Sequence, residues 1–122
     1  MRRRSALGVL AAGALLGCHR KAPDRRLRIE PRQIAGGRRA VVDYRGEPVE
    51  VFRAGDEAVA RSLVCTHYGC RVEWRGDRRR YECPCHLGTY DEAGQPIAGP
   101  PTRPLRRLPA VIEGDAVLLG ER

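Results

Sequence analysis

Two short clusters of cysteine and histidine constrain the fold of this chain more than any other feature. They read CTHYGC, from Cys65 to Cys70, and CPCH, from Cys83 to His86, and twelve residues separate them. A chain of 122 residues with one Trp and one Phe buries a small core, so a metal or a disulfide adds much to its stability. The fold is therefore expected to form around these two clusters.

Three arrangements of the four cysteines and two histidines compete. A tetrahedral zinc ion takes four ligands, so a zinc site leaves two of the six groups without a role. Two disulfides suit an exported chain, but they leave His67 and His86 unexplained. A binuclear iron–sulfur cluster with two Cys on one iron and two His on the other, together with one disulfide, uses all six groups.

The sequence from Ile29 onward predicts β structure. Short apolar or β-branched runs recur there between Gly, Pro and Asp residues. The expected strands are Arg38–Tyr44, Pro48–Arg53, Ala58–Val64, Arg71–Arg75, Arg79–Glu82, Arg106–Glu113 (interrupted by Pro109) and Ala116–Leu119. Tight turns are expected at Arg45-Gly46-Glu47, Arg75-Gly76-Asp77 and Glu113-Gly114-Asp115. Because Gly94–Pro104 holds four prolines, it is predicted to be a loop rather than a strand.

The N-terminus is typical of an export signal, predicted to cover residues 1–17. Arg2–Arg4 precede an apolar run, Ala6–Gly17, that is too short to span a membrane. The run ends in Leu15-Leu16-Gly17-Cys18, which resembles a bacterial lipobox and implies a lipid on Cys18. A buried N-terminal helix with a stray Cys is the alternative, and the choice between twin-arginine and general export stays open. Residues 18–28 are predicted to be a flexible tether, and residues 29–120 the folded domain.

The charge of the chain does not by itself indicate a nucleic-acid partner. The net charge is +8, and three of the arginines belong to the predicted signal. The other arginines are scattered through the chain, which indicates a compositional bias as readily as a binding patch. No nucleic-acid partner is expected.

The two clusters together resemble the cluster-binding boxes of Rieske iron–sulfur proteins, over the segment from Cys65 to Pro101. The resemblance implies an all-β fold, a Rieske-like antiparallel β sandwich with a small inserted cluster-binding subdomain at about residues 64–101. It implies one [2Fe-2S] cluster, with Cys65 and Cys83 on one iron and His67 and His86 on the other. It also implies a disulfide between Cys70 and Cys85, which is typical of the high-potential branch of the family.

The resemblance extends to residues that adjust the redox potential. Tyr90 lies where many high-potential members have a Tyr that donates to a ligand Cys. Gly88 lies where those members have a Ser that donates to a bridging sulfide, so a lower potential than theirs is predicted. Gly99-Pro100-Pro101 resembles the proline loop that covers the cluster. Replacing two thiolates by neutral imidazoles lowers the negative charge of the centre, which raises its potential relative to an all-Cys cluster.

These features predict a one-electron carrier, held at the outer face of the membrane by a lipid on Cys18. It would pass electrons between a quinol pool or a periplasmic oxidoreductase and a cytochrome-type acceptor. An electron-transfer component or subunit is expected rather than a stand-alone enzyme, located in the bacterial cell envelope on the periplasmic or outer face. A Rieske subunit of a cytochrome bc-type quinol-oxidising complex is one alternative. A structural zinc-binding module is an alternative of another class.

Overall fold

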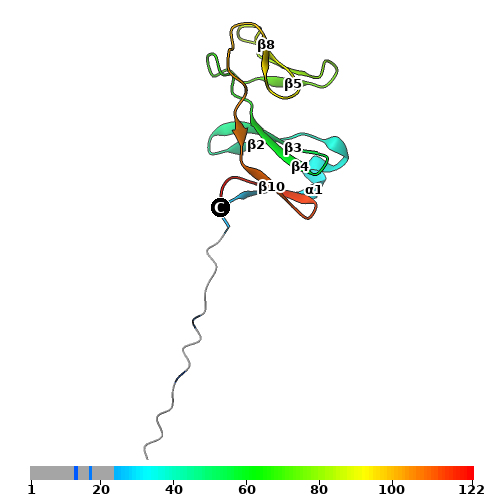
Figure 1. Ribbon diagram of the computed structural model, residues 1–122, viewed down its shortest axis with the longest axis vertical. Coiled ribbons are helices and arrows are strands. Elements are labelled where there is room, and N and C mark those ends of the chain that lie inside the picture. The colour runs from blue at the N-terminus through cyan, green and yellow to red at the C-terminus, as the bar shows by residue number, and fades with distance from the viewer. Residues whose placement is uncertain (1–12, 14–16, 18–23) are drawn as a thin grey trace, which may run out of the picture.

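The fold of the described residues is almost entirely β structure. The computed structural model describes Gly13, Gly17 and residues 24–122, so Cys18 lies outside the described residues. Residues 24–122 form three antiparallel sheets (Figure 1), and their helical part is one turn, α1 (Pro31–Ile34), followed by a 3-10 turn (Ala35–Gly37). No helix in the described part of the chain is long and apolar enough to span a membrane.

Two of the sheets form a base. One has the strand order β1-β11-β10 and the other the order β2-β3-β4-β9. Their strands are β1 (Leu27–Ile29), β2 (Ala40–Tyr44), β3 (Glu47–Ala54), β4 (Glu57–Ser62), β9 (Arg107–Leu108), β10 (Ala110–Glu113) and β11 (Ala116–Leu119). The buried faces of both sheets share one core, which is aliphatic: Ile29, Ile34, Ala40, Val49, Val51, Ala58, Ala60, Leu108, Val117 and Leu119.

The third sheet is inserted in the sequence between β4 and β9. Its order is β5-β6-β7-β8, with β5 (Glu73–Arg75), β6 (Arg80–Glu82), β7 (Thr89–Tyr90) and β8 (Pro96–Ala98). It occupies the end of the molecule opposite β10 and the C-terminus (Figure 1). Its core is separate from that of the base and includes two free thiols: Leu63, Cys65, Val72, Tyr81, Cys83, Tyr90 and Leu105.

A half-buried arginine joins the base to the inserted sheet. The Arg39 guanidinium lies 3.9 Å from the ring centroid of Phe52, in β3, and 3.7 Å from that of Trp74, in β5. Its Nη1 donates to Glu50 at 3.2 Å and to the Tyr81 hydroxyl at 3.1 Å. Because Glu50 is 1% exposed, its negative charge depends on this partner. The junction is therefore held by stacking and charge as well as by backbone connections.

The structure confirms the antiparallel β fold and most of the expected strands. Each of the seven predicted segments contains a strand, and Pro109 separates β9 from β10 as expected. At the predicted turn before Glu47, Arg45 and Gly46 both have positive φ, 56° and 81°. That geometry suits a two-residue hairpin turn, and Tyr44 pairs with Glu47 across it.

Two predictions about the ends and loops were wrong. β8 lies inside the segment predicted to be a loop, where Thr89 pairs with Ala98 and Tyr90 with Pro96. β1 begins at Leu27, so the last two residues of the predicted tether belong to a strand that pairs with β11. The remaining residues predicted as tether include Asp24 and Arg25, which lie in no helix or strand, and residues 18–23, which are outside the described residues.

Candidate metal centre

Two loops at the outer end of the inserted sheet carry the cysteine and histidine clusters. In the Cys65 loop (residues 63–72), the Cys65 N–H donates to the Cys70 carbonyl at 2.7 Å and the Gly69 N–H donates to the Cys65 carbonyl at 3.0 Å. In the Cys83 loop (residues 83–88), the Cys83 N–H donates to the Gly88 carbonyl at 2.7 Å. Each loop is thus closed at its base by its own backbone, which fixes where its side chains project.

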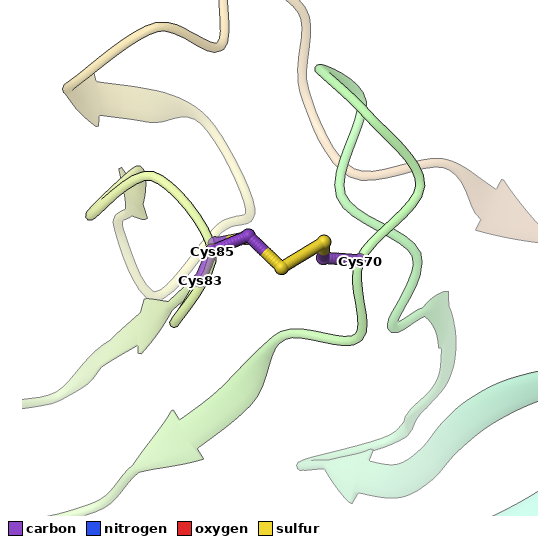
Figure 2. A group of neighbouring side chains, drawn as sticks. All are labelled: Cys70, Cys83 and Cys85. Carbon is purple, nitrogen blue, oxygen red and sulfur yellow. A yellow bond between two sulfur atoms is a disulfide. The ribbon is translucent and has the colours of Figure 1, made fainter.

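A disulfide between Cys70 and Cys85 joins the two loops (Figure 2). Their Cα atoms are 6.4 Å apart. The sulfur atoms of Cys70, Cys83 and Cys85 all lie within 4.8 Å of one another. A site using these three sulfurs as thiolates is excluded in the bonded state, because the disulfide occupies two of them. Cys83 and Cys85, on either side of Pro84, therefore differ: Cys85 is in the disulfide and Cys83 is a free thiol.

The two free thiols, those of Cys65 and Cys83, are buried, at 4% and 2% exposure. Burial raises the pKa of the Cys83 thiol above its usual value, although backbone hydrogen bonds from Cys85 and His86 oppose that rise. At Cys65, burial acts in the same direction, but hydrogen bonds from the Tyr90 hydroxyl and the His67 backbone outweigh it, so the Cys65 pKa is lowered. Since the thiolate is the form that binds metals, the hydroxyl and backbone donors around Cys65 and Cys83 favour the ligand form of both sulfurs.

The two histidines of the clusters lie side by side on the surface. The His67 and His86 ring centroids are 5.3 Å apart, with the rings close to perpendicular. The Tyr68 ring lies 3.9 Å from that of His67 and 5.2 Å from that of His86. Tyr68 and Leu87 are 71% and 81% exposed, so an aromatic and an aliphatic side chain flank the two imidazoles.

Tyr90 makes the contact predicted from its position. Its hydroxyl lies 3.3 Å from the Cys65 sulfur, and it accepts a hydrogen bond from the Thr66 N–H at 3.1 Å. Tyr90 is fully buried, and burial, together with its contact with Cys65, raises the pKa of its hydroxyl. The hydroxyl therefore keeps its proton and can donate it to the sulfur.

Gly88 and the proline loop are packed against each other. A Cβ at Gly88 would lie 2.7 Å from Pro101 Cγ and 2.8 Å from Pro101 Cδ. Gly99, with φ of 82°, faces Gly88 in turn, since a Cβ there would lie 2.8 Å from the Gly88 Cα. The missing side chain at Gly88 is therefore required for packing, in addition to its predicted effect on hydrogen bonding. A serine at this position would have to displace Pro101.

The family of the chain follows from a match that includes all of these residues. The family model of the Rieske [2Fe-2S] domain matches residues 27–109. The chain belongs to the Rieske [2Fe-2S] family. The match spans both loops, the disulfide and the proline loop, and it covers most of the base.

Curated Rieske relatives match the same part of the chain. The cytochrome b6-f complex iron-sulfur subunit of Chlorobaculum thiosulfatiphilum is 35% identical over 89 residues, which are 73% of this chain and 49% of the relative. The menaquinol:cytochrome c reductase iron-sulfur subunit of Bacillus subtilis is 39% identical over 75 residues, which are 58% of this chain and 45% of the relative. The chain thus spans about half the length of these relatives.

Solved Rieske structures share the fold. A cyanobacterial plasma membrane Rieske protein from Synechocystis has a TM-score of 0.60 at 27% identity, covering 68% of this chain and 86% of that one. A chain of a hyperthermophilic respiratory complex III has a TM-score of 0.63 at 30% identity, covering 77% and 74%. The ferredoxin of carbazole 1,9a-dioxygenase from Nocardioides aromaticivorans has a TM-score of 0.58 at 28% identity, covering 80% and 98%.

The side chains fit the [2Fe-2S] cluster of a Rieske protein. Two free thiols lie together in the core, and two imidazoles lie together at the surface. This is the donor set of a cluster with two Cys on one iron and two His on the other. The Cys70–Cys85 disulfide takes the two remaining cysteines and fits the high-potential type of Rieske protein.

Two groups of residues near the site were not found from the sequence. Thr66 lies between two of the predicted ligands, and its hydroxyl lies 3.0 Å from the Tyr90 hydroxyl and donates to the Arg103 carbonyl at 2.9 Å. Beneath the site, the Tyr81 hydroxyl donates to Glu50 at 2.5 Å and accepts from Arg61 at 2.7 Å. Burial and the Glu50 carboxylate raise the pKa of Tyr81 to about 12. Only the position of Thr66 inside CTHYGC gave any signal for these contacts.

Proposed function

We propose that the protein is a membrane-tethered one-electron carrier, in which Cys65 and Cys83 bind one iron of a Rieske cluster and His67 and His86 bind the other. It passes electrons between a quinol pool or a periplasmic oxidoreductase and a cytochrome-type acceptor. A lipid on Cys18 holds it in the bacterial cell envelope, on the periplasmic or outer face. The bound cluster supplies the one-electron redox chemistry of the family.

One observation carries this proposal: the four proposed ligands divide into a buried pair and an exposed pair. The two thiols are buried in the core of the inserted sheet, and the Tyr90 hydroxyl lies 3.3 Å from the Cys65 sulfur. The two imidazoles lie at the surface beside the exposed Tyr68 ring, and the exposed Leu87 follows His86 in the chain. A partner that docks on the imidazoles therefore comes close to the redox centre without entering the fold.

The ligand assignment is tested by metal analysis and electron paramagnetic resonance. Anaerobically purified protein should contain equal amounts of iron and acid-labile sulfide. After reduction with dithionite it should give a signal whose average g value lies below that of the free electron. His67→Ala and His86→Ala should each abolish this signal, whereas His19→Ala, at the third histidine of the chain, should leave it unchanged. Zinc without iron in iron-replete cells would instead support the structural zinc module.

The relatives favour a second candidate function. Two of them are named as iron-sulfur subunits of a cytochrome b6-f complex and of a menaquinol:cytochrome c reductase. On that basis the chain would be the Rieske subunit of a cytochrome bc-type quinol-oxidising complex. Mild detergent extraction distinguishes the two functions: a complex subunit should co-purify with a b-type cytochrome at constant stoichiometry, whereas a free carrier should separate from it.

A further inference from the structure

A broad groove lies on the base of the molecule. It has a volume of about 1010 Å³ and is bounded by the start of the described domain, the β2–β3 turn and the last residues of the chain. Four of its lining residues are arginines: Arg25, Arg45, Arg106 and Arg122. The C-terminal residues that line it lie at the end of the molecule opposite the inserted sheet (Figure 1).

When the side chains that form ion pairs are set aside, the groove has more arginines than acidic residues. Asp24 is held by Arg26, which donates from Nε at 2.8 Å, and these contacts keep the pKa of Asp24 well below its usual range. Arg106 forms an ion pair with Glu47. Among the described residues, Arg25, Arg45 and Arg122 form no ion pair, and neither does the lining acid Glu121, although the charge of Arg122 contributes to the lowered pKa of Asp24. The groove thus keeps an excess of positive charge.

The floor of the groove is apolar and shaped by two residues. Tyr44 packs over Gly120, where a Cβ would collide with the tyrosine hydroxyl, and Leu108 and Pro109 complete the floor. The Arg45 guanidinium lies 5.1 Å from the centroid of the Tyr44 ring, which places a cation at the edge of this floor. An apolar floor with an arginine rim suits an amphiphile with an anionic head, because guanidinium groups bind phosphate through paired N–H donors.

The position of the groove in the sequence brings it close to a membrane. Asp24 and Arg25 line it, and Asp24 is the sixth residue after Cys18. Six extended residues span at most about 20 Å. A lipid on Cys18 would therefore hold the groove within reach of the headgroups.

We propose that this arginine groove binds the phosphate of an anionic phospholipid and so orients the domain on the membrane. The proposal rests on the membrane location in the proposed function. Docking through the groove directs the inserted sheet away from the bilayer, because the groove is lined by the C-terminal residues and the C-terminus lies opposite the inserted sheet (Figure 1). His67 and His86 then face a partner that projects from the membrane or is dissolved beside it. In this orientation the donor is the periplasmic oxidoreductase of the proposed function rather than a quinol within the bilayer.

Vesicle binding tests the groove without the lipid anchor. The probe protein is the cluster-loaded chain 18–122 with Cys18→Ser, which keeps every strand and cannot be acylated. It should bind vesicles of phosphatidylcholine mixed with phosphatidylglycerol, and bind vesicles of phosphatidylcholine alone weakly. Arg45→Gln combined with Arg122→Gln should weaken binding by on the order of tenfold to thirtyfold, because each arginine near an anionic surface contributes about 1 kcal/mol. The control pair Arg71→Gln and Arg103→Gln removes the same charge at the opposite end and should preserve binding.

Three results would overturn the proposal. Equal weakening by the groove pair and the control pair would mean that net charge alone acts. Equal binding to the two kinds of vesicle would exclude the anionic headgroup. Binding of inorganic phosphate without binding of mixed vesicles would exclude a lipid as its source. Because the probe protein lacks the acyl chain, these outcomes are independent of whether Cys18 is lipidated in cells.

The single tryptophan reports the orientation. Trp74 lies in β5 of the inserted sheet, beside the junction with the base, and it does not line the groove. Brominated phosphatidylglycerol in the vesicles should therefore leave its fluorescence at the level seen with unbrominated lipid. Quenching of Trp74 would show that the inserted sheet meets the membrane and would overturn the orientation.

Discussion

At the scale of single residues, the Tyr90 hydroxyl is the group that most directly affects the proposed cluster. It lies 3.3 Å from the Cys65 sulfur and is held in place by the Thr66 N–H. A donor at this distance stabilises the more negative, reduced state more than the oxidised state. Tyr90 is also fully buried, so water cannot replace its hydrogen bond when the hydroxyl is removed.

Tyr90→Phe should therefore lower the reduction potential. The loss of one hydrogen bond to a charged group costs about 1.5–3 kcal/mol, which corresponds to roughly 65–130 mV for a one-electron couple. A redox titration followed by electron paramagnetic resonance measures the change. Tyr44→Phe, in the base, is the matched control and should leave the potential unchanged. A Tyr90→Phe potential equal to that of the wild type would contradict the proposed role.

Gly88 requires a different design, because its neighbour Pro101 occupies the space that a side chain would need. Gly88→Ser alone is expected to displace the proline loop and expose the cluster. Its reduction potential would then reflect this exposure as well as any new hydrogen bond. Pro101→Ala removes the two atoms that would clash. The double variant Gly88→Ser/Pro101→Ala should then have a higher potential than Pro101→Ala alone, because the new hydroxyl can donate to a sulfide. A potential no higher than that of Pro101→Ala would mean that the hydroxyl does not reach the cluster.

At the scale of elements, the two ligand-bearing loops are held together by the Cys70–Cys85 disulfide. Cys70→Ser/Cys85→Ser should destabilise the folded protein by about 3 kcal/mol, the entropy of closing a loop with this sequence separation of 15. Loss of the visible absorption of the cluster in guanidinium should occur at lower denaturant in the variant. Wild type treated with a disulfide reductant should behave like the variant. If all three proteins lose the cluster at the same denaturant concentration, the disulfide does not hold the site together.

The junction between base and inserted sheet depends on Arg39. Arg39→Ala leaves the buried Glu50 carboxylate without its cation and removes the contacts with Phe52 and Trp74. The free energy of unfolding should fall by about 3 kcal/mol, as measured by guanidinium unfolding followed through Trp74 fluorescence. Arg38→Ala, at the neighbouring exposed residue, is the control and should change it little. Equal stability of the two variants would contradict a structural role for the Arg39 junction.

The elements that could be predicted from the sequence are those with their own apolar pattern. The segments that became β2, β3, β4 and β11 each have a run of β-branched or aliphatic residues, and most of these are buried, although Glu50 and Arg61 are buried as well. β7 and β8 have two and three residues, too few for a pattern. Their pairing, in which Tyr90 lies opposite Pro96, is a tertiary feature.

β1 was missed for a different reason. It pairs with β11, so Leu27 lies opposite Leu119 at the far end of the chain. A local pattern of three residues does not reveal such a partner. The packing of Gly88 on Pro101 is likewise a contact between loops. The resemblance of the two sequence clusters predicts the ligands and the disulfide. The neighbours of those residues, in contrast, are determined by the tertiary fold.

At the scale of the whole molecule, the inserted sheet, whose loops carry the proposed ligands, lies opposite the end where the C-terminus and the start of the described domain are found (Figure 1). A tether attached at one end therefore leaves the histidines free to meet a partner. This arrangement suits a carrier as well as a mobile subunit of a larger complex. It also means that membrane attachment and cluster chemistry can be altered independently.

Removing the proposed lipid site tests that independence. Cys18→Ser should release the protein from membranes into the soluble periplasmic fraction, with an unchanged electron paramagnetic resonance signal, whereas His19→Ser should stay attached. Because the arginine groove can hold a domain on anionic lipid without an acyl chain, the membranes must be washed with concentrated salt, which screens that contact. Correctly cleaved Cys18→Ser protein that resists the salt wash would contradict lipidation. If Cys18→Ser protein stays on the membranes until the salt wash releases it, the groove also contributes to membrane attachment.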